Sequence, residues 1–251
     1  MKIDCIADLH GNYPQLEGGD LLIVAGDLLS ADDLDGWAAF EMWLRGQEYR
    51  MKVVVAGNHD MSAQVTPQIG ETLEKNEGVK YLCDSGTEFE GVKIWGCPWT
   101  LTFDGINPKC TGFVGTEEEL KEHYDLIPEG TQILVTHGPS KNILDKTVID
   151  ESVGSTALSN ALIRVRPLLH VHGHIHEAYG YFKATFMQEE TQESLGEMHV
   201  VNCSYVDSNY EVTNQPFRIN LDVIATTTIA EDTEFAPVTA DDLIQEAVVV
   251  E

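Results

Sequence analysis

Short runs of aliphatic and β-branched residues, each followed by small polar residues, recur along the chain. Such runs predict buried strands, because strands covered on both faces are apolar throughout instead of alternating with polar positions. The predicted strands are residues 2–7, 20–25, 51–56, 132–136 and 168–172.

Between these strands, apolar positions recur at helical spacing. Residues 33–47 predict a helix whose apolar positions lie near one another: Leu34, Trp37, Ala38, Met42 and Leu44. We interpret the aromatic residues of this helix, Trp37, Phe40 and Trp43, as core or as a partner surface rather than as a substrate box.

Local signals define further elements. Residues 116–124 begin with Thr116 and Glu119, the spacing of a capping box, and predict a helix. Residues 155–166 carry an apolar stripe and predict another. Residues 86–96 predict a hairpin with its turn at Glu90-Gly91.

The order of these elements indicates the fold class. Strands alternating with helices predict an α/β sheet with helices on its faces. Residues 178–221 contain further strand-like segments, at 198–203 and 216–221, and a polar stretch at 184–197 that we expect to be a loop or hairpin insertion. Two sheets therefore fit better than one, and we predict a layered α/β-β-α sandwich.

Composition limits the number of domains. The chain has 251 residues, of which 43% are hydrophobic, and this is enough for one large domain with its own core. No Lys or Arg follows Arg218, and the segment from Asp222 onward is acidic. We therefore predict one domain over residues 1–221 and an acidic C-terminal extension over residues 222–251.

The charge of the chain constrains its partners. The formal net charge is −27, so the surface repels nucleic-acid backbones, and long nucleic acid is not an expected partner. An anionic substrate would need a local positive charge, and bound metal ions are a natural source of it.

Two further observations concern the cellular compartment. The chain has no apolar run of the ~20 residues that cross a bilayer, and its start lacks the layout of a secretory signal. The cysteines are odd in number, scattered and never in a C-x-x-C pair. We therefore expect free thiols, a cytoplasmic location and no membrane partner.

The residues with candidate chemistry follow the predicted strands. In an α/β sheet the carboxyl ends of the strands open into the crevice where ligands bind, so these side chains are expected to meet. The segments are Asp8-Leu9-His10, Gly26-Asp27, Gly57-Asn58-His59-Asp60, Thr136-His137-Gly138 and Gly173-His174-Ile175-His176.

Carboxylate, imidazole and amide groups together suit manganese, iron or zinc. The glycines at 26, 57 and 173 let the backbone turn sharply or approach an ion closely. Each segment alone has an ordinary interpretation, because Asp and Asn are frequent turn and cap residues and a single His137 is more often a core histidine. Their occurrence together, each at a strand end, favours a metal site.

The set D-x-H, G-D, G-N-H-D, T-H-G and G-H-I-H resembles that of the calcineurin-like metallophosphoesterases over residues 2–221. Further features are similar to one branch, the MPPED (239AB-like) phosphodiesterases. The stretch between His10 and Gly26 is too short for the helix usual in other branches. The runs ILVTHGPSKNILD (133–145) and VRPLLHVHGHIHEAYG (165–180) are also similar to that branch.

The resemblance implies a site with two divalent metal ions (manganese, iron or zinc) bridged by Asp27 and by a hydroxide that attacks phosphorus. One ion would be held by Asp8, His10, Asp27 and His176, and the other by Asp27, Asn58, His137 and His174.

It also implies roles for neighbouring residues. His59 would be the general acid that protonates the leaving alkoxide, and Asp60 would orient its imidazole and raise its pKa. Asp60 could instead be a turn residue or a helix cap. His172, two residues before His174, is either an additional substrate group or a buried strand histidine, and we favour the buried histidine.

Taken together, these observations predict a dimetal phosphoesterase acting on phosphodiesters of small nucleotide-type substrates, such as cyclic nucleotides. The alternatives are a metal-dependent phosphomonoesterase, a nuclease, or a metal-stabilised binding protein without turnover. The sequence leaves the native metal, the substrate and the oligomeric state open.

Overall fold

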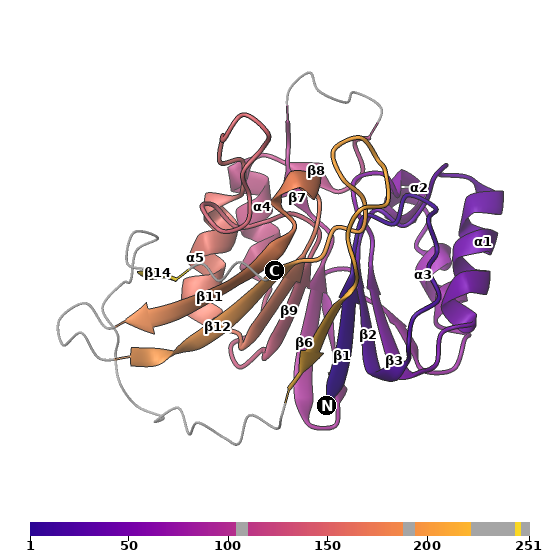
Figure 1. Ribbon diagram of the computed structural model, residues 1–251, viewed down its shortest axis with the longest axis horizontal. Helices are drawn as coiled ribbons and strands as arrows, with labels where there is room; N and C mark the ends of the chain where they lie inside the picture. Colours follow the sequence, from indigo (N-terminus) through magenta and orange to yellow (C-terminus); the bar gives the residue numbers. More distant parts are fainter. Residues whose placement is uncertain (104–109, 188–193, 222–243, 247–251) are drawn as a thin grey trace.

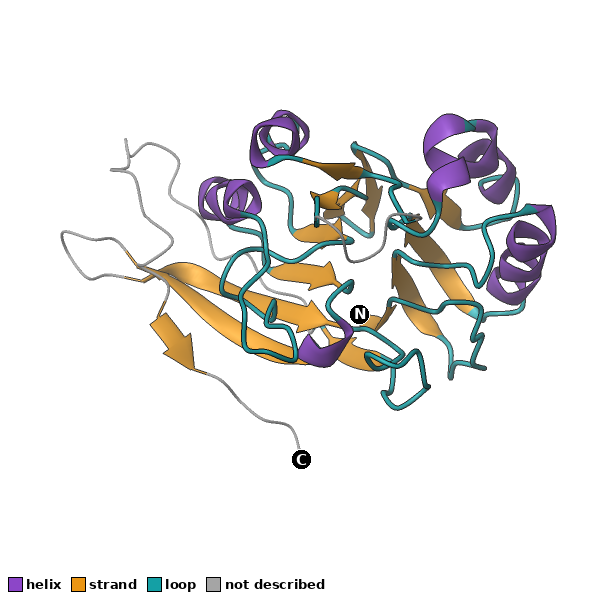
Figure 2. Cartoon of the chain, turned by 90° about the horizontal axis from the view of Figure 1, so that it is seen from above, coloured by secondary structure: helices purple, strands orange, loops and turns teal. Residues whose placement is uncertain are grey.

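Two β-sheets face each other through the middle of the molecule, and helices cover the outer face of each (Figure 1). The computed structural model describes residues 1–103, 110–187 and 194–221, together with the backbone of 244–246. Viewed from above, the helices form separate groups beside the two sheets (Figure 2). This architecture confirms the predicted layered α/β-β-α sandwich.

The first sheet has the strand order β13-β1-β2-β3-β4. The strands β1 to β4 are parallel, and β13 pairs with β1 in the antiparallel direction. The strands predicted at 2–7, 20–25 and 51–56 are confirmed. The bounds are β1 (Lys2–Ile6), β2 (Gly19–Ala25), β3 (Tyr49–Val55), β4 (Val79–Tyr81) and β13 (Phe217–Asn220).

The second sheet has the order β14-β11-β12-β10-β9-β6-β5. Its central strands β6, β9, β10 and β12 are parallel, and the outer pairs are antiparallel. The bounds are β5 (Ser85–Phe89), β6 (Val92–Cys97), β9 (Ile133–Thr136), β10 (Leu169–His172), β11 (Gly180–Met187), β12 (Ser194–Asn202) and β14 (Ile244–Glu246).

The three longer helices, α1, α4 and α5, begin at polar residues whose side chains cap them: Asp33, Thr116 and Ser155. In the α4 helix, Thr116 and Glu119 form the predicted capping box. The short α2 and α3 helices were not predicted, because elements of five and six residues are too short to show helical periodicity. The remaining bounds are α1 (Leu34–Arg45), α2 (Met61–Val65), α3 (Gln68–Leu73), α4 (Glu117–Tyr124), α5 (Thr156–Val165), η1 (His176–Ala178), β7 (Thr100–Leu101) and β8 (Val114–Gly115).

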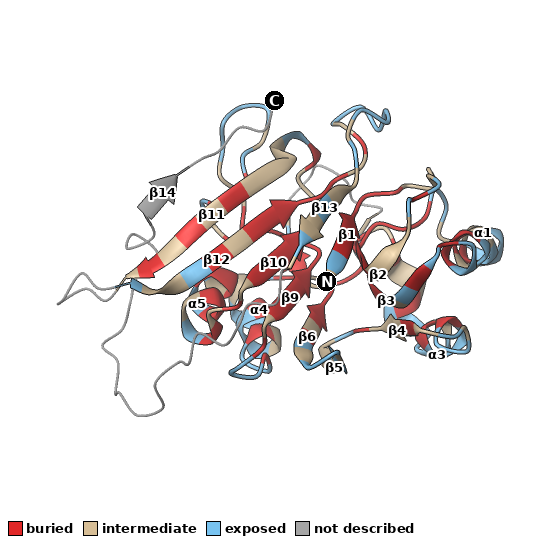
Figure 3. Ribbon diagram, turned by 60° about the horizontal axis from the view of Figure 1, so that its bottom comes forward, coloured by how far each residue is buried: buried red, intermediate tan, exposed pale blue. Residues whose placement is uncertain are grey.

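Alternating side chains of the strands fill two different cores. In β1, Ile3 and Cys5 point between the sheets, whereas Ile6 points outward beneath α1. Both faces of these strands are covered, which explains their continuous apolar sequence. The inner strands are accordingly buried along most of their length, whereas the helices are buried on one side only (Figure 3).

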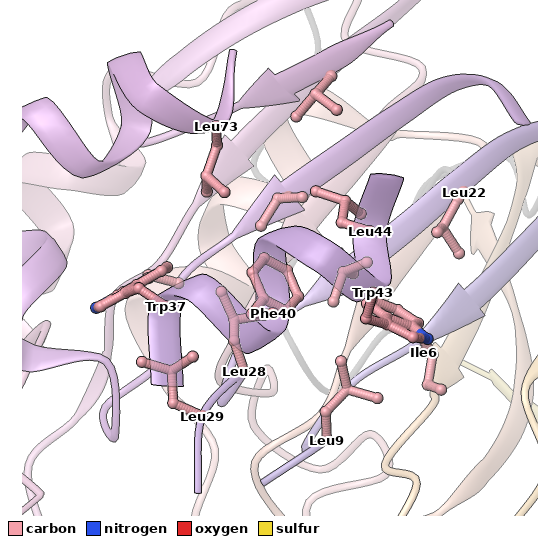
Figure 4. Close-up of a cluster of buried hydrophobic side chains, with 14 of the residues drawn as sticks. Ile6, Leu9, Leu22, Leu28, Leu29, Trp37, Phe40, Trp43, Leu44 and Leu73 are labelled. Atoms are coloured by element: carbon pink, nitrogen blue, oxygen red, sulfur yellow. The ribbon is translucent and has the colours of Figure 1, made fainter. Parts of the chain in front are cut away.

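The α1 helix buries only part of the predicted face, Trp37 and Leu44, together with Phe40 and Trp43, which we interpreted as core or as a partner surface. Its buried stripe contains Trp37, Phe40 and Leu44, with Phe40 in the centre of the cluster (Figure 4). Leu34 and Met42 are 87% and 73% exposed, so the prediction that they share the apolar face is wrong. The helix turns its aromatic stripe toward the sheet rather than Leu34 and Met42, because the larger rings bury more apolar area.

The later part of the chain contains a long hairpin. The β11 and β12 strands form it, so the segment predicted as a loop or hairpin insertion at 184–197 is a hairpin whose residues 188–193 lie outside the described residues. The predicted domain boundary after residue 221 is not tested. Within the predicted acidic extension, Ile244–Glu246 pairs with β11, and the other residues of 222–251 lie outside the described residues.

Candidate dimetal centre

The predicted ligands come together at one edge of the sandwich, where parallel strands of both sheets end. The β1, β2 and β3 strands end there in one sheet, and β9 and β10 end there in the other. Backbone hydrogen bonds join neighbouring strand-end loops, from Asp8 N to Gly26 O (2.9 Å) and from Gly173 N to His137 O (3.1 Å). These bonds fix the loops relative to one another before any ligand binds.

Asp8, His10 and His176 form a first group of donor atoms, all within 4.8 Å of one another. The Nε2 atoms of His10 and His176 are 3.3 Å apart, and His176 Nε2 lies 3.5 Å from Asp8 Oδ1. Nitrogen and oxygen donors at this separation can share one divalent ion.

Asp27, His137 and His174 form a second group with the same spacing. His137 Nε2 lies 3.3 Å from Asp27 Oδ1 and 2.9 Å from Asn58 Oδ1. The other carboxylate oxygen of Asp27, Oδ2, lies 3.7 Å from His10 Nε2 in the first group. The carboxylate of Asp27 is therefore placed between the two groups.

Hydrogen bonds behind the ligands leave the correct ring nitrogens for metal binding. His137 Nδ1 lies 3.0 Å from Ala25 O, and His176 Nδ1 lies 3.0 Å from Asp207 O. A ring whose Nδ1–H donates to a carbonyl presents the Nε2 lone pair to a metal. The residues present therefore fit a pair of divalent ions in both chemistry and tautomer.

Within each donor group, a carboxylate and an imidazole shift each other's pKa. Burial raises the pKa of Asp27, but the charge of His137 outweighs it and holds the pKa well below the usual range of a carboxyl. Burial lowers the pKa of His137, but the charge of Asp27 raises it to about 9. His176 behaves in the same way beside Asp8, with a pKa of about 9. Protons thus occupy these imidazoles in the metal-free protein.

The pKa values of the other two histidine ligands, His10 and His174, are lowered instead of raised. Burial lowers the pKa of His10 to about 4 and that of His174 to about 3. Both imidazoles are therefore neutral at physiological pH and ready to bind a metal without losing a proton.

His59 lies at the rim of the centre. Its backbone N–H donates to Asp27 Oδ1 (2.9 Å), and its Nε2 lies 3.8 Å from Asp27 Oδ2. Its Nδ1 is 3.4 Å from Cys110 Sγ, and the side chain is 22% exposed. The imidazole is thus fixed beside the shared carboxylate and open to solvent, where a proton donor to a bound substrate would have to be.

Asp60 does not contact the His59 imidazole, and it closes a turn, as in the alternative we gave, with its N–H donating to Gly57 O (3.1 Å). Its carboxylate accepts hydrogen bonds from Gly57 N (2.8 Å) and Leu28 N (3.1 Å), and not from the ring of His59. Although Asp60 precedes α2, its side chain does not cap that helix. Burial, followed by the charge of Asp27, raises the pKa of Asp60 to about 8. Asp60 connects the loops after β2 and β3, and so acts on the site through the backbone.

His172 is a buried strand histidine, as we favoured. Leu169 and Val171 point between the sheets, so His172 points toward the opposite face. Its ring packs 5.1 Å from that of His170, and its Nδ1 lies 3.3 Å from Gly173 O. Neither of these contacts joins its ring to a metal-binding donor atom, although the charge of Asp8 acts on it.

Several residues at the centre were not predicted. Ser204 Oγ donates to Asp8 Oδ2 (2.6 Å), and Asp207 accepts from His176 through its carbonyl. Ser204 directly follows the predicted strand 198–203. A polar residue directly after a predicted strand is the same signal that indicated the proposed ligands. Tyr210, whose ring lies 4.8 Å from that of His10, is far from any predicted strand end and had no such signal.

A family comparison agrees with this geometry. The model of the calcineurin-like phosphoesterases matches residues 1–178, which include every predicted ligand. The chain belongs to the calcineurin-like phosphoesterase family. The predicted resemblance to metallophosphoesterases is thereby confirmed, and the protein is a family member with Asp and His groups able to bind metal.

The chain is also similar in sequence to individual known proteins. The chain is 33% identical over 243 residues to human "Metallophosphoesterase domain-containing protein 1", covering 86% of this chain and 70% of the human protein. It is also 33% identical over 194 residues to "Probable rhamnogalacturonate lyase C" of Emericella nidulans, covering 72% of this chain but 17% of the fungal protein.

Solved structures share the fold at low sequence identity. The structure of TT1561 of Thermus thermophilus has a TM-score of 0.53 at 16% identity, covering 80% of this chain and 88% of that one. Another has a TM-score of 0.59 at 15% identity, covering 80% and 89%. Within the described residues, no helix has the length and apolar character needed to cross a membrane.

Proposed function

We propose that this phosphoesterase is a phosphodiesterase that hydrolyses small nucleotide-type diesters, such as cyclic nucleotides. The observation that supports this most is the pair of donor groups that Asp27 joins. Each group contains nitrogen and oxygen donors within 4.8 Å, and the two groups lie side by side through the two oxygens of one carboxylate.

We further propose seven ligands: Asp8, His10, Asp27, Asn58, His137, His174 and His176. Two divalent ions held there would bind phosphate oxygens, acidify a water molecule and neutralise the negative charge that develops at phosphorus. Manganese, iron and zinc all suit this set of donors.

The chain's own side chains provide the rest of the chemistry. His59 is open to solvent beside Asp27 and would give a proton to the leaving oxygen. Asp60 holds the two loops that carry Asp27 and Asn58, through hydrogen bonds to Leu28 and Gly57. This arrangement fixes the ligands before substrate binds, so little reorganisation is needed during the reaction.

The charge of the protein favours a diester over a monoester. A diester carries one negative charge at neutral pH, whereas a monoester carries nearly two. A protein with net charge −27 repels the monoester more strongly at long range. The same repulsion disfavours long nucleic acid, so we propose a small phosphoester as substrate, with a cytoplasmic location and no membrane partner.

The test is hydrolysis of bis-p-nitrophenyl phosphate and of p-nitrophenyl phosphate, with Mn²⁺, Fe²⁺ or Zn²⁺. We expect turnover of the diester to exceed that of the monoester. Asp27→Asn should abolish turnover and reduce the bound metal measured by elemental analysis. Asp20→Asn is the control, because it removes the same charge from a surface residue that accepts a hydrogen bond from Lys2 N. It should change neither turnover nor metal content. Wild-type protein without diester turnover in any of these metals would refute the proposal.

A further inference from the structure

Tyr210 covers part of the candidate centre. Its ring centroid lies 4.8 Å from that of His10, 5.2 Å from that of His176 and 6.3 Å from that of His59. None of these contacts is a face-to-face stack, because the ring planes meet at 76°, 89° and 59°. The residue is 48% exposed. A flat surface of the ring therefore remains available beside the ligands.

The loop that carries Tyr210 is closely held. Val206 and Val212 pair across its base, and the Asp207 carboxylate accepts from the backbone N–H groups of Asn209 (2.8 Å) and Glu211 (3.0 Å). The carbonyl of Asp207 also accepts from Tyr210 N (2.9 Å) and faces His176 Nδ1. The loop is thus connected directly to one of the proposed ligands.

The backbone of Tyr210 is strained. Its φ is +64°, in the left-handed region that Gly and Asn adopt most easily and that bulky residues avoid. A large aromatic side chain in this conformation costs of order 1–3 kcal/mol, and such strain persists where the surrounding structure imposes it, often at functional sites. With this backbone conformation the ring lies beside His10 and His176.

The ring lies near His59, with 6.3 Å between the ring centroids, so a leaving group that His59 protonates would depart on this side. His59, the proposed proton donor to the leaving oxygen, lies between Asp27 and Cys110 on this side. A group bonded to that oxygen would extend past His59 toward Tyr210. Planar aromatic groups pack favourably on such a ring, by about 0.5–1.5 kcal/mol beyond their buried area.

We propose that Tyr210 determines specificity by packing against a planar, aromatic leaving group, so that the preferred substrates are phosphodiesters whose leaving alcohol carries an aryl group or a nucleobase. This inference rests on the proposed function, because it assumes that the centre cleaves phosphodiesters.

The test compares two monoanionic diesters, methyl phenyl phosphate and methyl hexafluoroisopropyl phosphate. Their leaving alcohols are of similar acidity, but only one is aromatic. Both release methyl phosphate, which ³¹P NMR detects. We expect Tyr210→Asn, which suits the left-handed backbone, to lower kcat/KM about tenfold for the phenyl ester and less than about twofold for the other, as loss of an aromatic contact predicts. Tyr210→Phe should retain the preference.

Phe103 provides the matched control. Its ring lies 5.3 Å from that of His174, in the other donor group. We expect Phe103→Leu to change kcat/KM for both esters by the same factor. Metal content is measured for every variant, and Tyr210→Leu replaces the Asn variant if that variant binds less metal.

Three outcomes separate the inference from the function on which it rests. If wild-type protein cleaves both esters and loss of the Tyr210 ring lowers both rates equally, or neither, the specificity role is refuted while the phosphodiesterase remains. If wild-type protein cleaves bis-p-nitrophenyl phosphate but neither ester, the specificity role of Tyr210 is refuted. If it cleaves none of the three diesters with Mn²⁺, Fe²⁺ or Zn²⁺, the proposed function fails, and the role of Tyr210 fails with it.

Discussion

Several proposed ligands have an uncommon backbone conformation. Asp8, His10, Asp27 and His174 have φ values of 51°, 43°, 52° and 70°. Each such residue costs of order 1–2 kcal/mol relative to an ordinary conformation. Backbone hydrogen bonds such as His10 N to Asp27 O (3.0 Å) hold the strained turns in place. The fold therefore gives up some stability at the ends of β1, β2 and β10 to direct these side chains to a common point.

At this scale, His59 provides a prediction that depends on the substrate. His59→Gln should lower kcat about 10²–10⁴-fold for a diester with an alkyl leaving group, because that alkoxide needs a proton. For bis-p-nitrophenyl phosphate the loss should be less than about tenfold, because p-nitrophenolate is a weak base and leaves without one. Steady-state kinetics with both substrates make the comparison.

The metal content of the His59→Gln protein is the control for this experiment, and it should equal that of the wild type. Equal losses of rate for the two substrates would mean that His59 binds metal or phosphate and does not donate a proton.

At the scale of elements, the site depends on close approach of strand-end loops. A Cβ atom at Gly57 would overlap Asp27 Oδ1 and the His137 ring, and one at Gly173 would overlap Asp8 Oδ2. Glycine at these positions is therefore required because the ligands of a neighbouring strand occupy the space. The requirement arises between elements, since these two residues have no left-handed φ of their own.

Gly57→Ala should displace Asp27 or His137 and weaken metal binding about 10–100-fold, the usual effect of disturbing the groups that support ligands. Gly180→Ala is the matched control, because a Cβ there meets only ordinary contacts. Metal titrations of both proteins measure the effect. An unchanged affinity in the Gly57→Ala protein would show that the loops can separate without loss of the site.

At the scale of the molecule, the centre connects the two sheets. Asp8, Asp27 and Asn58 follow strands of one sheet, and His137 and His174 follow strands of the other. Two ions bound by these residues would join the halves of the sandwich. Because the metal binds only the folded protein, it should also stabilise it, by ~4 kcal/mol at a thousandfold excess over Kd.

Metal binding should release protons. His137 and His176 have pKa values of about 9 in the metal-free protein, so both are charged at pH 7, whereas a metal requires the neutral imidazole. We expect these two imidazoles to release about two protons at pH 7, falling toward none as the pH rises past about 9, in addition to the proton lost by the metal-bound water. Calorimetric titrations in buffers of different ionisation enthalpy measure this number, and a heat independent of the buffer at pH 7 would contradict it.

Sequence reasoning succeeded where a local pattern has one structural solution. The β1, β2 and β3 strands follow from apolar runs, and the Thr116 capping box follows from local hydrogen-bonding chemistry. Polar residues directly after strands identified the residues around the centre, because parallel strands end at the same edge. The predicted apolar face of α1 was wrong at Leu34 and Met42, because the larger aromatic rings of the same helix bury more apolar area.

The sequence by itself determined the layered α/β architecture, the strand ends and the kinds of ligand at each one, because these depend on periodicity and on side-chain chemistry. The family resemblance already implied that Asp27 is shared between two ions, and the structure places its two oxygens beside two donor groups. Only the tertiary structure decided that Asp60 holds backbone N–H groups instead of an imidazole, and that the Tyr210 ring lies beside His10 and His176. These features depend on distances between segments far apart in the chain, which packing of the two sheets fixes and no local pattern contains.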